Sequence, residues 1–373
     1  MGHSKGLRTY DTIVIGAGII GAACAWRLKK LGQRVLVLET NMPGTGATAA
    51  CMGHIVVMDD SPAQFALCHY SRTQWLELLP RMPPDCEASR CGTIWVAADD
   101  EEMQAVERKM RMYAGAGIAC EVLSNASLRK YEPNLRDDLA GGLRVPDDLS
   151  VYPTNCSNWF LRDVDVKSGV EVVSLKEHQV DDAKGDRYLG DNVILAAGGL
   201  SSELLPELPI APRKGHLIIT ERADDFCFHQ IVELGYLKSA HQMGSESVAF
   251  NIQPRTTGQV LLGSSREFCG WDGSINRNIV MRMIARGVEY MPALARLSAI
   301  RIWTGFRPCT KDNLPLIGTW PAVSGLYIAA GHEGLGITTS LGTAELITSA
   351  ITGNEPAFDP RPYHPARAAE AAP

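Results

Sequence analysis

Three glycines near the start of the chain have the spacing of a turn that binds a pyrophosphate. They are Gly16, Gly18 and Gly21, in the pattern G-x-G-x-x-G. The first permits a tight turn, the second lets the backbone approach a phosphate, and the third lets a helix pack closely on a strand. Because N–H groups and the dipole at a helix start favour negative charge, the pattern predicts phosphates at the start of the helix that follows.

An acidic residue follows at a spacing that suits a ribose contact. Glu39 comes after Gly16 at close to the roughly 20 residues at which an acid accepts hydrogen bonds from ribose hydroxyls. A carboxylate there also disfavours a cofactor that carries a 2′-phosphate. The turn and the acid together predict a dinucleotide site, with a glycine turn that binds no ligand as the alternative.

The surrounding segments have the patterns of the elements that would position these residues. The β-branched run at 11–15 predicts a buried strand, and the apolar spacing of 22–31 predicts a helix that ends at Gly32. A second apolar run at 34–38 predicts another buried strand, with Glu39 at its end. Strand, turn, helix and strand agree with one another, as a Rossmann-like unit requires.

Three later segments are rich in small residues and glycine. Residues 43–53 would leave room for a bulky ligand, although a flexible surface loop is the alternative. Residues 191–199 and 326–337 each have the pattern of an apolar strand followed by small residues. Such separated strands suit an extended dinucleotide better than a nicotinamide site. These segments resemble the D-amino-acid oxidase-like family of flavoproteins, and the resemblance implies that FAD is the cofactor.

The most informative single stretch is 303–318, which contains the pattern G-x-R-P-x-[ST]-x-D-x-x-P-x-I-G. It resembles the corresponding segment of glycine oxidase-like and D-hydroxyproline dehydrogenase-like members of that family. In those relatives the arginine of the motif binds the substrate carboxylate, and Arg307 occupies its place. A guanidinium suits this role because it stays charged and can hold both carboxylate oxygens. A structural ion pair between Arg307 and an acid such as Asp312 is the alternative.

A second resemblance runs through 233–241, 246–251 and 263–268. These segments look like the subgroup that contains D-hydroxyproline dehydrogenases and the flavoprotein subunit of hydrogen cyanide synthase. Tyr236 lies in the first of them. It is a candidate for lining the substrate pocket, or else a half-buried tyrosine whose hydroxyl has a partner.

The resemblance implies an enzyme that oxidises the carbon–nitrogen bond of a small amino acid by hydride transfer to flavin N5. A D-hydroxyproline or D-proline-type dehydrogenase that forms a pyrroline carboxylate is the first expectation. The alternatives are a glycine, sarcosine or other D-amino-acid oxidase, and an electron-transfer flavoprotein subunit of a heteromeric amine dehydrogenase. An NAD-dependent dehydrogenase and a flavoprotein that acts on tRNA bases also remain open.

The candidate catalytic residues are Arg307, His54, Tyr236 and His332. Either histidine could tune the flavin or the amine, because histidine titrates near neutral pH, and each is equally a candidate packing residue. No general base is named, since the flavin accepts the electrons and the protein supplies alignment. The candidate cofactor-binding residues are Gly16, Gly18, Ile19, Ile20, Gly21, Glu39, Thr40, Gly46, Ala47, Thr48, Met52, Gly53, His54, Val172, Ala197, Gly198, Arg307, Gly331, Glu333, Gly334, Leu335, Gly336 and Ile337.

The sequence departs from the family pattern in three places. Residues 151–191 are compact, which bears on adenine contacts near Val172. Residues 214–216 are Lys-Gly-His instead of the more usual Arg-Gly-Gln, which bears on how the sheet meets the flavin edge. Cys309 lies where relatives have a small residue, so it is either an attachment point for the flavin or a buried thiol.

The expected fold class is α/β, with a Rossmann-like FAD-binding domain and an α+β substrate domain built on a mostly antiparallel sheet. The substrate domain is expected to contain helices at 101–114 and 279–291 and strands at 216–220, 247–253 and 259–263. The proline- and alanine-rich end is expected to be loosely ordered. The expected boundaries are 8–80, 146–212 and 305–355 for the FAD-binding domain, 81–145 and 213–304 for the substrate domain, and 356–373 for a C-terminal tail.

Composition limits the classes of partner. The 373 residues are 45% hydrophobic, and their formal net charge of −6 offers no positive field for a nucleic-acid backbone. The ten cysteines include no C-x-x-C pair and no zinc-type cluster, so no metal is expected. The absence of a signal-peptide pattern and of an apolar run of about 18 residues predicts a cytoplasmic protein without an integral membrane segment. The expected partner is a small amino-acid substrate, and a homo-oligomer or heteromeric electron-transfer partners are left open.

Overall fold

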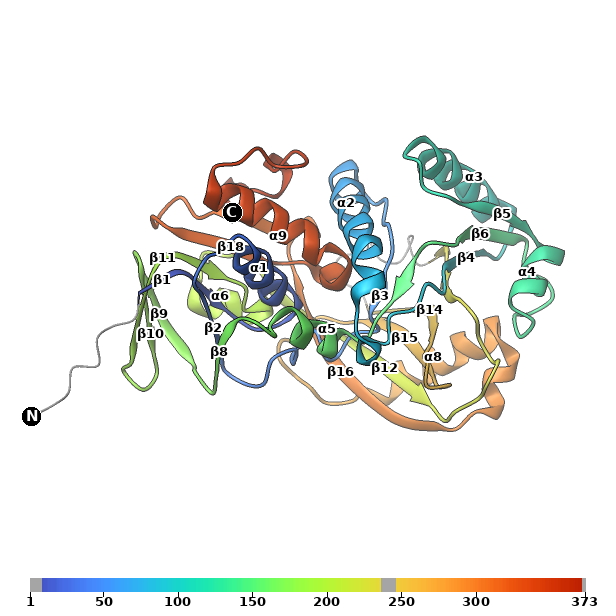
Figure 1. Ribbon diagram of the computed structural model, residues 1–373. Coiled ribbons are helices and arrows are strands. Elements are labelled where there is room, and N and C mark those ends of the chain that lie inside the picture. The colour runs from blue at the N-terminus through green and yellow to red at the C-terminus, as the bar shows by residue number, and fades with distance from the viewer. Residues whose placement is uncertain (1–8, 236–245, 371–373) are drawn as a thin grey trace, which may run out of the picture.

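The computed structural model describes residues 9–235 and 246–370, which form two large β-sheets with helices packed against them (Figure 1). Figure 1 shows the first sheet on the left, around β1 and β11, and the second sheet extending to β5 and β6 on the right. Helix α2 stands between these two regions.

The first sheet has the strand order β17-β18-β11-β1-β2-β8, and the hairpin β9–β10 pairs with β11. β1 runs parallel to β11 and β2, β18 runs parallel to β11, and β8 runs parallel to β2. This parallel arrangement confirms the Rossmann-like prediction. The strands are β1 (Thr9–Ile15), β2 (Val35–Glu39), β8 (Asp165–Ser168), β9 (Val172–Lys176), β10 (Gln179–Asp182), β11 (Arg187–Leu195), β17 (Leu316–Thr319) and β18 (Leu326–Ala330).

Both faces of the first sheet are buried. Side chains alternate along β1, so Val14 packs on one face while Ile13 and Ile15 pack on the other with the hairpin β9–β10. This two-sided burial explains why the strand is continuously apolar rather than alternating. The helices on the Val14 face are α1 (Ile19–Lys30), α2 (Pro62–Leu78), α5 (Pro153–Phe160) and α9 (Gly336–Thr352).

The second sheet has the order β16-β12-β15-β14-β13-β4-β6-β5. β13 and β4 pair in parallel, and the other neighbouring strands pair antiparallel, so the prediction of a mostly antiparallel sheet is confirmed. The strands are β4 (Thr93–Ala97), β5 (Glu121–Ser124), β6 (Gly141–Val145), β12 (Ala211–Thr220), β13 (Gln230–Glu233), β14 (Ser247–Pro254), β15 (Val260–Arg266) and β16 (Ala299–Cys309).

Two capped helices pack against this second sheet, as expected from their apolar spacing. Asp99 begins α3 (Asp100–Gly115) by accepting a hydrogen bond from the N–H of Glu102 at 2.9 Å. Asn276 caps α8 (Arg277–Tyr290) in the same way. The remaining elements are β3 (His54–Ile55), β7 (Leu149–Ser150), α4 (Asn125–Tyr131), α6 (Ser201–Leu204), α10 (Arg367–Glu370) and the 3-10 helices η1 (Leu79–Arg81), η2 (Pro84–Cys86), η3 (Gly198–Leu200), η4 (Pro292–Arg296), η5 (Glu333–Leu335) and η6 (Arg361–Tyr363).

Two long strands cross the expected domain boundaries. The strands of the first sheet lie within the segments expected for FAD binding, and most strands of the second sheet lie within those expected for the substrate domain. However, β12 begins at Ala211 and β16 continues to Cys309, and these two strands pair with each other. The second sheet therefore reaches into the proposed FAD-binding segments at the point where Arg307 lies.

The expectation of a loosely ordered C-terminal end is wrong for residues 356–370. The side chain of Tyr363 is 1% exposed, and its hydroxyl donates a hydrogen bond to the carbonyl of Ala63. Arg367 donates to the carboxylate of Asp312 at 3.0 Å. The proline and alanine content obscured these anchoring side chains, which attach the segment to α2 and to the loop after β16.

The compact segment between residues 151 and 191 supplies α5, β8 and the hairpin β9–β10. The N–H of Val170 donates to the carbonyl of Glu39 at 3.0 Å. Val172 is buried in the same apolar cluster as Leu36 and Leu38. The segment therefore passes beside the end of β2, where the acid predicted to contact a ribose lies.

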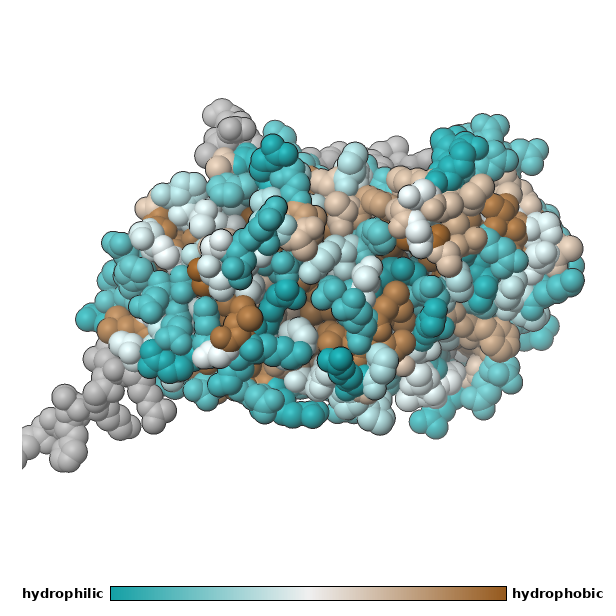
Figure 2. Space-filling view, turned by 45° about the horizontal axis from the view of Figure 1, so that its top comes forward, coloured by the Kyte–Doolittle hydropathy of each residue, from teal (hydrophilic) through white to brown (hydrophobic). Residues whose placement is uncertain are grey.

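Hydrophilic residues cover much of the face shown in Figure 2, and hydrophobic residues form separate patches among them. Within the described ranges, no helix has the length and apolar character needed to cross a membrane. Nor do those residues contain a group of three or more His, Cys, Asp or Glu side chains placed to hold a metal ion.

Candidate active site

The glycine turn after β1 is too tightly packed for side chains at two of its three glycines. Gly16 has a φ of +102°, and a Cβ there would lie 2.5 Å from the carbonyl oxygen of Ala196, at the end of β11. A Cβ at Gly21 would overlap the carbonyl oxygen of Gly16. Glycine at these positions lets α1 start directly against the carboxyl ends of β1 and β11.

The start of α1 is surrounded by the residues that the sequence predicted to join it. Gly18 is the N-cap and contributes no side chain. The N–H of Ile19 donates to Thr48 Oγ1 at 3.1 Å, and the N–H of Ala17 donates to Glu39 Oε2 at 2.7 Å. Glu39 and Thr48 therefore flank the positive end of the helix, where an anionic ligand is favoured.

The small-residue loop at 43–53 contacts the start of α1 through Thr48 and the second sheet through Met52. Gly46 has a φ of +63° and open space around its Cβ position, whereas a Cβ at Gly53 would overlap the carbonyl oxygen of Val151. Met52 packs in a small apolar cluster with Leu217 and Leu261 of the second sheet. The loop is thus anchored at its far end and unobstructed in the middle. Ala47 within it and Thr40 just before it are exposed.

His54 follows this loop on β3 and is held by the start of α9. Its carbonyl accepts a hydrogen bond from Thr338 Oγ1 at 3.0 Å. Its ring nitrogen Nε2 is buried and has no hydrogen-bond partner among the described residues. Burial lowers the pKa of His54 to about 3, so the imidazole is neutral near pH 7. Within the described part of the chain, His54 Nε2 therefore lacks the partner that a buried polar nitrogen normally has.

His332 has a partner within the protein. Its side chain is 4% exposed, and Nε2 lies 2.9 Å from Thr343 Oγ1 in α9. Burial lowers the pKa of His332 to about 3. These contacts favour the packing role over the catalytic one.

The buried His332 is expected to make stability depend on pH. Its folded-state pKa lies below the ordinary value of about 6.5, so its contribution is present above pH 6.5 and is lost as the pH falls toward 3. At about 1.4 kcal/mol per pH unit, moving from pH 7 to pH 5 should cost about 2 kcal/mol. Urea unfolding of the His332→Gln variant, which keeps a polar group for Thr343, should show a correspondingly smaller loss.

The matched control for this measurement is His178→Gln, because the side chain of His178 is 51% exposed. This control should lose as much stability between pH 7 and pH 5 as the unaltered protein. An equally large loss in His332→Gln would show that His332 does not carry the effect.

Arg307 lies on β16, and its side chain packs against two glycines, Gly215 and Gly334. The Cβ position of Gly215 on the neighbouring strand is occupied by the guanidinium, and that of Gly334 lies 3.4 Å from Nε. Nη1 donates to the carbonyl of Ser265 at 3.0 Å, and the side chain is 20% exposed. Asp312 is not its acid partner, because that carboxylate binds Arg367. The alternative of a structural ion pair remains with another acid, since Arg307 Nε lies 3.9 Å from Glu333 Oε1.

Two further arginines, which the sequence analysis did not select, lie beside Arg307. Arg213 lies on β12, and its Nη1 is 3.8 Å from Glu333 Oε1. Arg266 lies at the end of β15, and its Nε is 3.4 Å from the same oxygen. Arg307 Nε is 3.9 Å from that oxygen. Burial alone would raise the pKa of Glu333, but attraction to Arg266, Arg307 and Arg213 lowers it below its ordinary value. Glu333, selected for its place in the glycine loop, is thus an ionised centre for three guanidinium groups.

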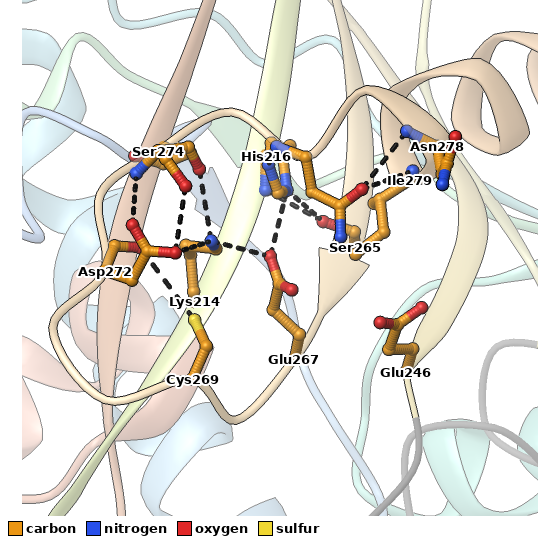
Figure 3. A network of polar contacts seen from close by, with 12 residues as sticks. Lys214, His216, Glu246, Ser265, Glu267, Cys269, Asp272, Ser274, Asn278 and Ile279 are labelled. Atoms are coloured by element: carbon orange, nitrogen blue, oxygen red, sulfur yellow. Dashed lines mark hydrogen bonds and ion pairs between the residues drawn. The ribbon is translucent and has the colours of Figure 1, made fainter.

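Lys214 and His216 belong to one network of polar contacts (Figure 3). Because side chains alternate along β12, both point to the opposite face of the second sheet from Arg213. Lys214 Nζ lies 3.0 Å from Glu267 Oε1 and donates to the carbonyl of Ser274 at 3.1 Å. His216 Nε2 accepts from the N–H of Asn276 at 3.0 Å. This network holds the loop before α8 in place. Of the three residues 214–216, only Gly215 therefore lies on the face of β12 against which Arg307 packs.

The other predicted residues lie as follows. The thiol of Cys309 is buried and 3.4 Å from Asn313 Oδ1, and burial raises its pKa, as expected for a packed thiol. Tyr236 lies outside the described residues. Ala197 and Gly198 follow β11 at η3, beside the glycine turn. At the start of α9 lie Gly331, Gly334, Leu335, Gly336 and Ile337.

The family model of the FAD dependent oxidoreductases (DAO) matches residues 11–350. The chain belongs to this family. The prediction of an FAD-dependent oxidoreductase is therefore confirmed, and the NAD-dependent alternative is not supported.

Individual relatives match along nearly the whole chain. A glycine oxidase of Pseudomonas aeruginosa is 29% identical over 95% of this chain and 98% of its own length. Hydrogen cyanide synthase subunit HcnC of the same species is 26% identical over 96% of both chains. The crystal structure of L-proline dehydrogenase from P. horikoshii superposes with a TM-score of 0.87 at 20% identity, covering 98% of this chain and 99% of that one, which shows a shared fold.

The site residues of this flavoprotein fit FAD. The N-cap of α1 is Gly18, which has no side chain. At Gly16 and Gly21 the backbone is packed too closely for a Cβ atom. The carboxylate of Glu39 lies beside that turn, and His54 Nε2 supplies a buried polar atom without a partner among the described residues. The turn suits the pyrophosphate and the acid suits the ribose.

Proposed function

We propose that this flavoprotein oxidises the carbon–nitrogen bond of a small amino acid. The observation that carries the proposal is the placement of Arg307. Its guanidinium occupies the Cβ position of Gly215, and its Nε lies 3.4 Å from the Cβ position of Gly334 in the glycine loop at 331–336. The names of the relatives agree with it, since they include glycine oxidases and a D-amino acid dehydrogenase of Vibrio cholerae.

The proposed FAD-binding residues are those of the glycine turn, the loop at 43–53, the end of β11 and the start of α9. In this assignment residues 16–21 bind the pyrophosphate, and Glu39 accepts hydrogen bonds from the ribose hydroxyls. Residues 331–337 contact the flavin ring. The proposed FAD-binding domain remains 8–80, 146–212 and 305–355. FAD, when bound, supplies the two-electron acceptor that converts an amine into an imine.

The contribution of the protein itself is position and charge. Arg307 binds the substrate carboxylate through two parallel hydrogen bonds and so fixes the α-carbon. The carbonyl of Ser265 and the carboxylate of Glu333 hold the guanidinium in place. His54, neutral because of its burial, offers Nε2 as a hydrogen-bonding atom without adding a charge.

The proposed substrate is a proline-type D-amino acid, with cis-4-hydroxy-D-proline as the first compound to test. The purified holoprotein should be titrated with it under anaerobic conditions while the visible flavin bands are recorded. Bleaching supports the proposal for this substrate. Yellow protein that bleaches only with glycine, sarcosine or another D-amino acid moves the substrate assignment to that compound, and yellow protein that no amino acid bleaches contradicts the proposal.

A second candidate function is that of an electron-transfer subunit in a heteromeric amine dehydrogenase. The observation that favours it is the end-to-end match to HcnC, which is named as a subunit of hydrogen cyanide synthase. Under this function the purified chain would show little turnover alone, and turnover would appear when partner subunits are added. Full turnover by the isolated chain would contradict it.

A further inference from the structure

Three arginines converge on one carboxylate oxygen on the side of the second sheet that faces the glycine loop. Arg213 Nη1, Arg266 Nε and Arg307 Nε lie 3.8, 3.4 and 3.9 Å from Glu333 Oε1. Arg213 and Arg307 are also directly opposite each other in the register of β12 and β16. Their side chains therefore project from the same face, with Cβ atoms about 5 Å apart.

This arrangement is unfavourable unless anions accompany it. Like charges directly opposite each other on paired strands destabilise a sheet. The side chain of Arg213 is only 2% exposed, and its Nε and Nη2 atoms are buried with no hydrogen-bond partner among the described residues. A buried guanidinium that lacks partners is costly, whereas one that binds an anion through two hydrogen bonds is stabilised.

Glu333 satisfies only part of the Arg213 guanidinium. Its Oε1 lies 3.8 Å from Nη1, and the Nε and Nη2 atoms keep no hydrogen-bond partner among the described residues. Because Arg213 and Arg307 are opposite each other in the sheet, the substrate carboxylate assigned to Arg307 would lie near these atoms.

We infer that Arg213 binds a second carboxylate, so that an amino acid that carries two carboxylate groups is preferred over the proline-type substrate proposed above. This inference rests on the proposed function, since it extends the site at Arg307. A proline-type amino acid engages Arg307 alone, whereas an N-carboxyalkyl amino acid or an amino dicarboxylate engages Arg213 as well. Phe268, whose ring lies 5.2 Å from the guanidinium of Arg213, supports that side chain from another direction.

The inference is tested with a matched pair of secondary amines, iminodiacetate and N-ethylglycine. They share one carboxylate and the amine, and they differ in whether the second arm ends in a carboxylate or a methyl group. In anaerobic stopped-flow reduction of the holoprotein, iminodiacetate should be preferred by about 30-fold or more, the factor expected for a charge-assisted hydrogen bond. No preference, or faster reduction by N-ethylglycine or cis-4-hydroxy-D-proline, overturns the inference and leaves the proposed function intact.

The variant Arg213→Met removes the charge while keeping much of the volume. It should lower the rate with iminodiacetate about 30-fold more than the rate with N-ethylglycine, and Arg213→Lys should restore part of the difference. Arg282→Met is the control, because Arg282 is exposed and pairs with Glu246 on the surface. Equal losses with both amines, together with a shifted flavin midpoint potential, would show that Arg213 acts on the cofactor and would overturn the inference.

A binding measurement covers the case in which Arg213→Met does not fold or no amine reduces the flavin. Malonate and propionate differ in the same way as the two amines. Malonate should perturb the flavin spectrum of the unaltered holoprotein at concentrations about 30-fold lower than propionate. Equal concentrations would overturn the inference even if the proposed oxidation fails independently.

Discussion

Replacing Arg307 with leucine is expected to lower kcat/KM for the amino-acid substrate by about three orders of magnitude while FAD stays bound. The substitution removes the two charge-assisted hydrogen bonds that Arg307 is proposed to make to the carboxylate, a loss of about 4 kcal/mol in the transition state. FAD should stay bound because the glycine turn, Glu39 and Thr48 lie on the first sheet and its adjoining loop.

The readout separates substrate binding from cofactor binding. Stopped-flow flavin reduction measures the dependence on substrate, and the visible spectrum measures bound FAD. Arg307→Lys keeps a positive charge but lacks the paired N–H donors of the guanidinium, so it should recover part of the lost kcat/KM. Arg367→Leu is a matched control, because Arg367 binds Asp312 away from the cluster and should affect stability more than KM. Unchanged kinetics in Arg307→Leu would remove the carboxylate assignment.

The cofactor turn could be predicted from the sequence because its requirements are local. Gly16 and Gly21 leave no room for a Cβ against backbone atoms nearby, and such limits appear directly as residue types at fixed spacing. The same holds for α3 and α8, whose apolar periodicity extends over several turns. Arg307 was identified as a candidate from the family resemblance, because its surroundings depend on strands far apart in the chain.

The arginine cluster could not be predicted, because it depends on register between distant segments. Arg213 and Arg307 face each other only because β12 and β16 pair in one register, and a shift of one residue would place them on opposite faces. Glu333 joins them from the loop after β18. Arg213 and Arg266 lie three residues outside the predicted strands at 216–220 and 259–263, and spacing alone does not reveal which strands are neighbours.

The histidines show a different limit. Residue type made His54 and His332 equal candidates, because either can titrate near neutral pH when exposed. Their partners distinguish them: His332 Nε2 lies beside Thr343 Oγ1, whereas His54 Nε2 has none among the described residues. Similarly, the tail after residue 356 has a composition typical of disorder, but Tyr363 anchors it.

Gly21→Ala is expected to have the largest effect on stability, about 3 kcal/mol, and to abolish tight FAD binding. The new Cβ would overlap the carbonyl oxygen of Gly16, which is backbone and cannot rotate away. The start of α1 would have to move away from β1, which disturbs the packing of Val14 and displaces the N–H groups proposed to bind the pyrophosphate.

Gly115→Ala at the end of α3 isolates the steric cause, because it adds the same methyl group where nothing lies within 4 Å. Alanine is the better helix former by up to about 1 kcal/mol, so this control should melt at or slightly above the temperature of the unaltered protein. Gly21→Ala should melt roughly 5–10 °C lower and purify with little flavin. If both variants kept their FAD and their melting temperature, α1 would not need the close approach to β1 that the turn provides, and the assignment of this turn to the pyrophosphate would lose its structural basis.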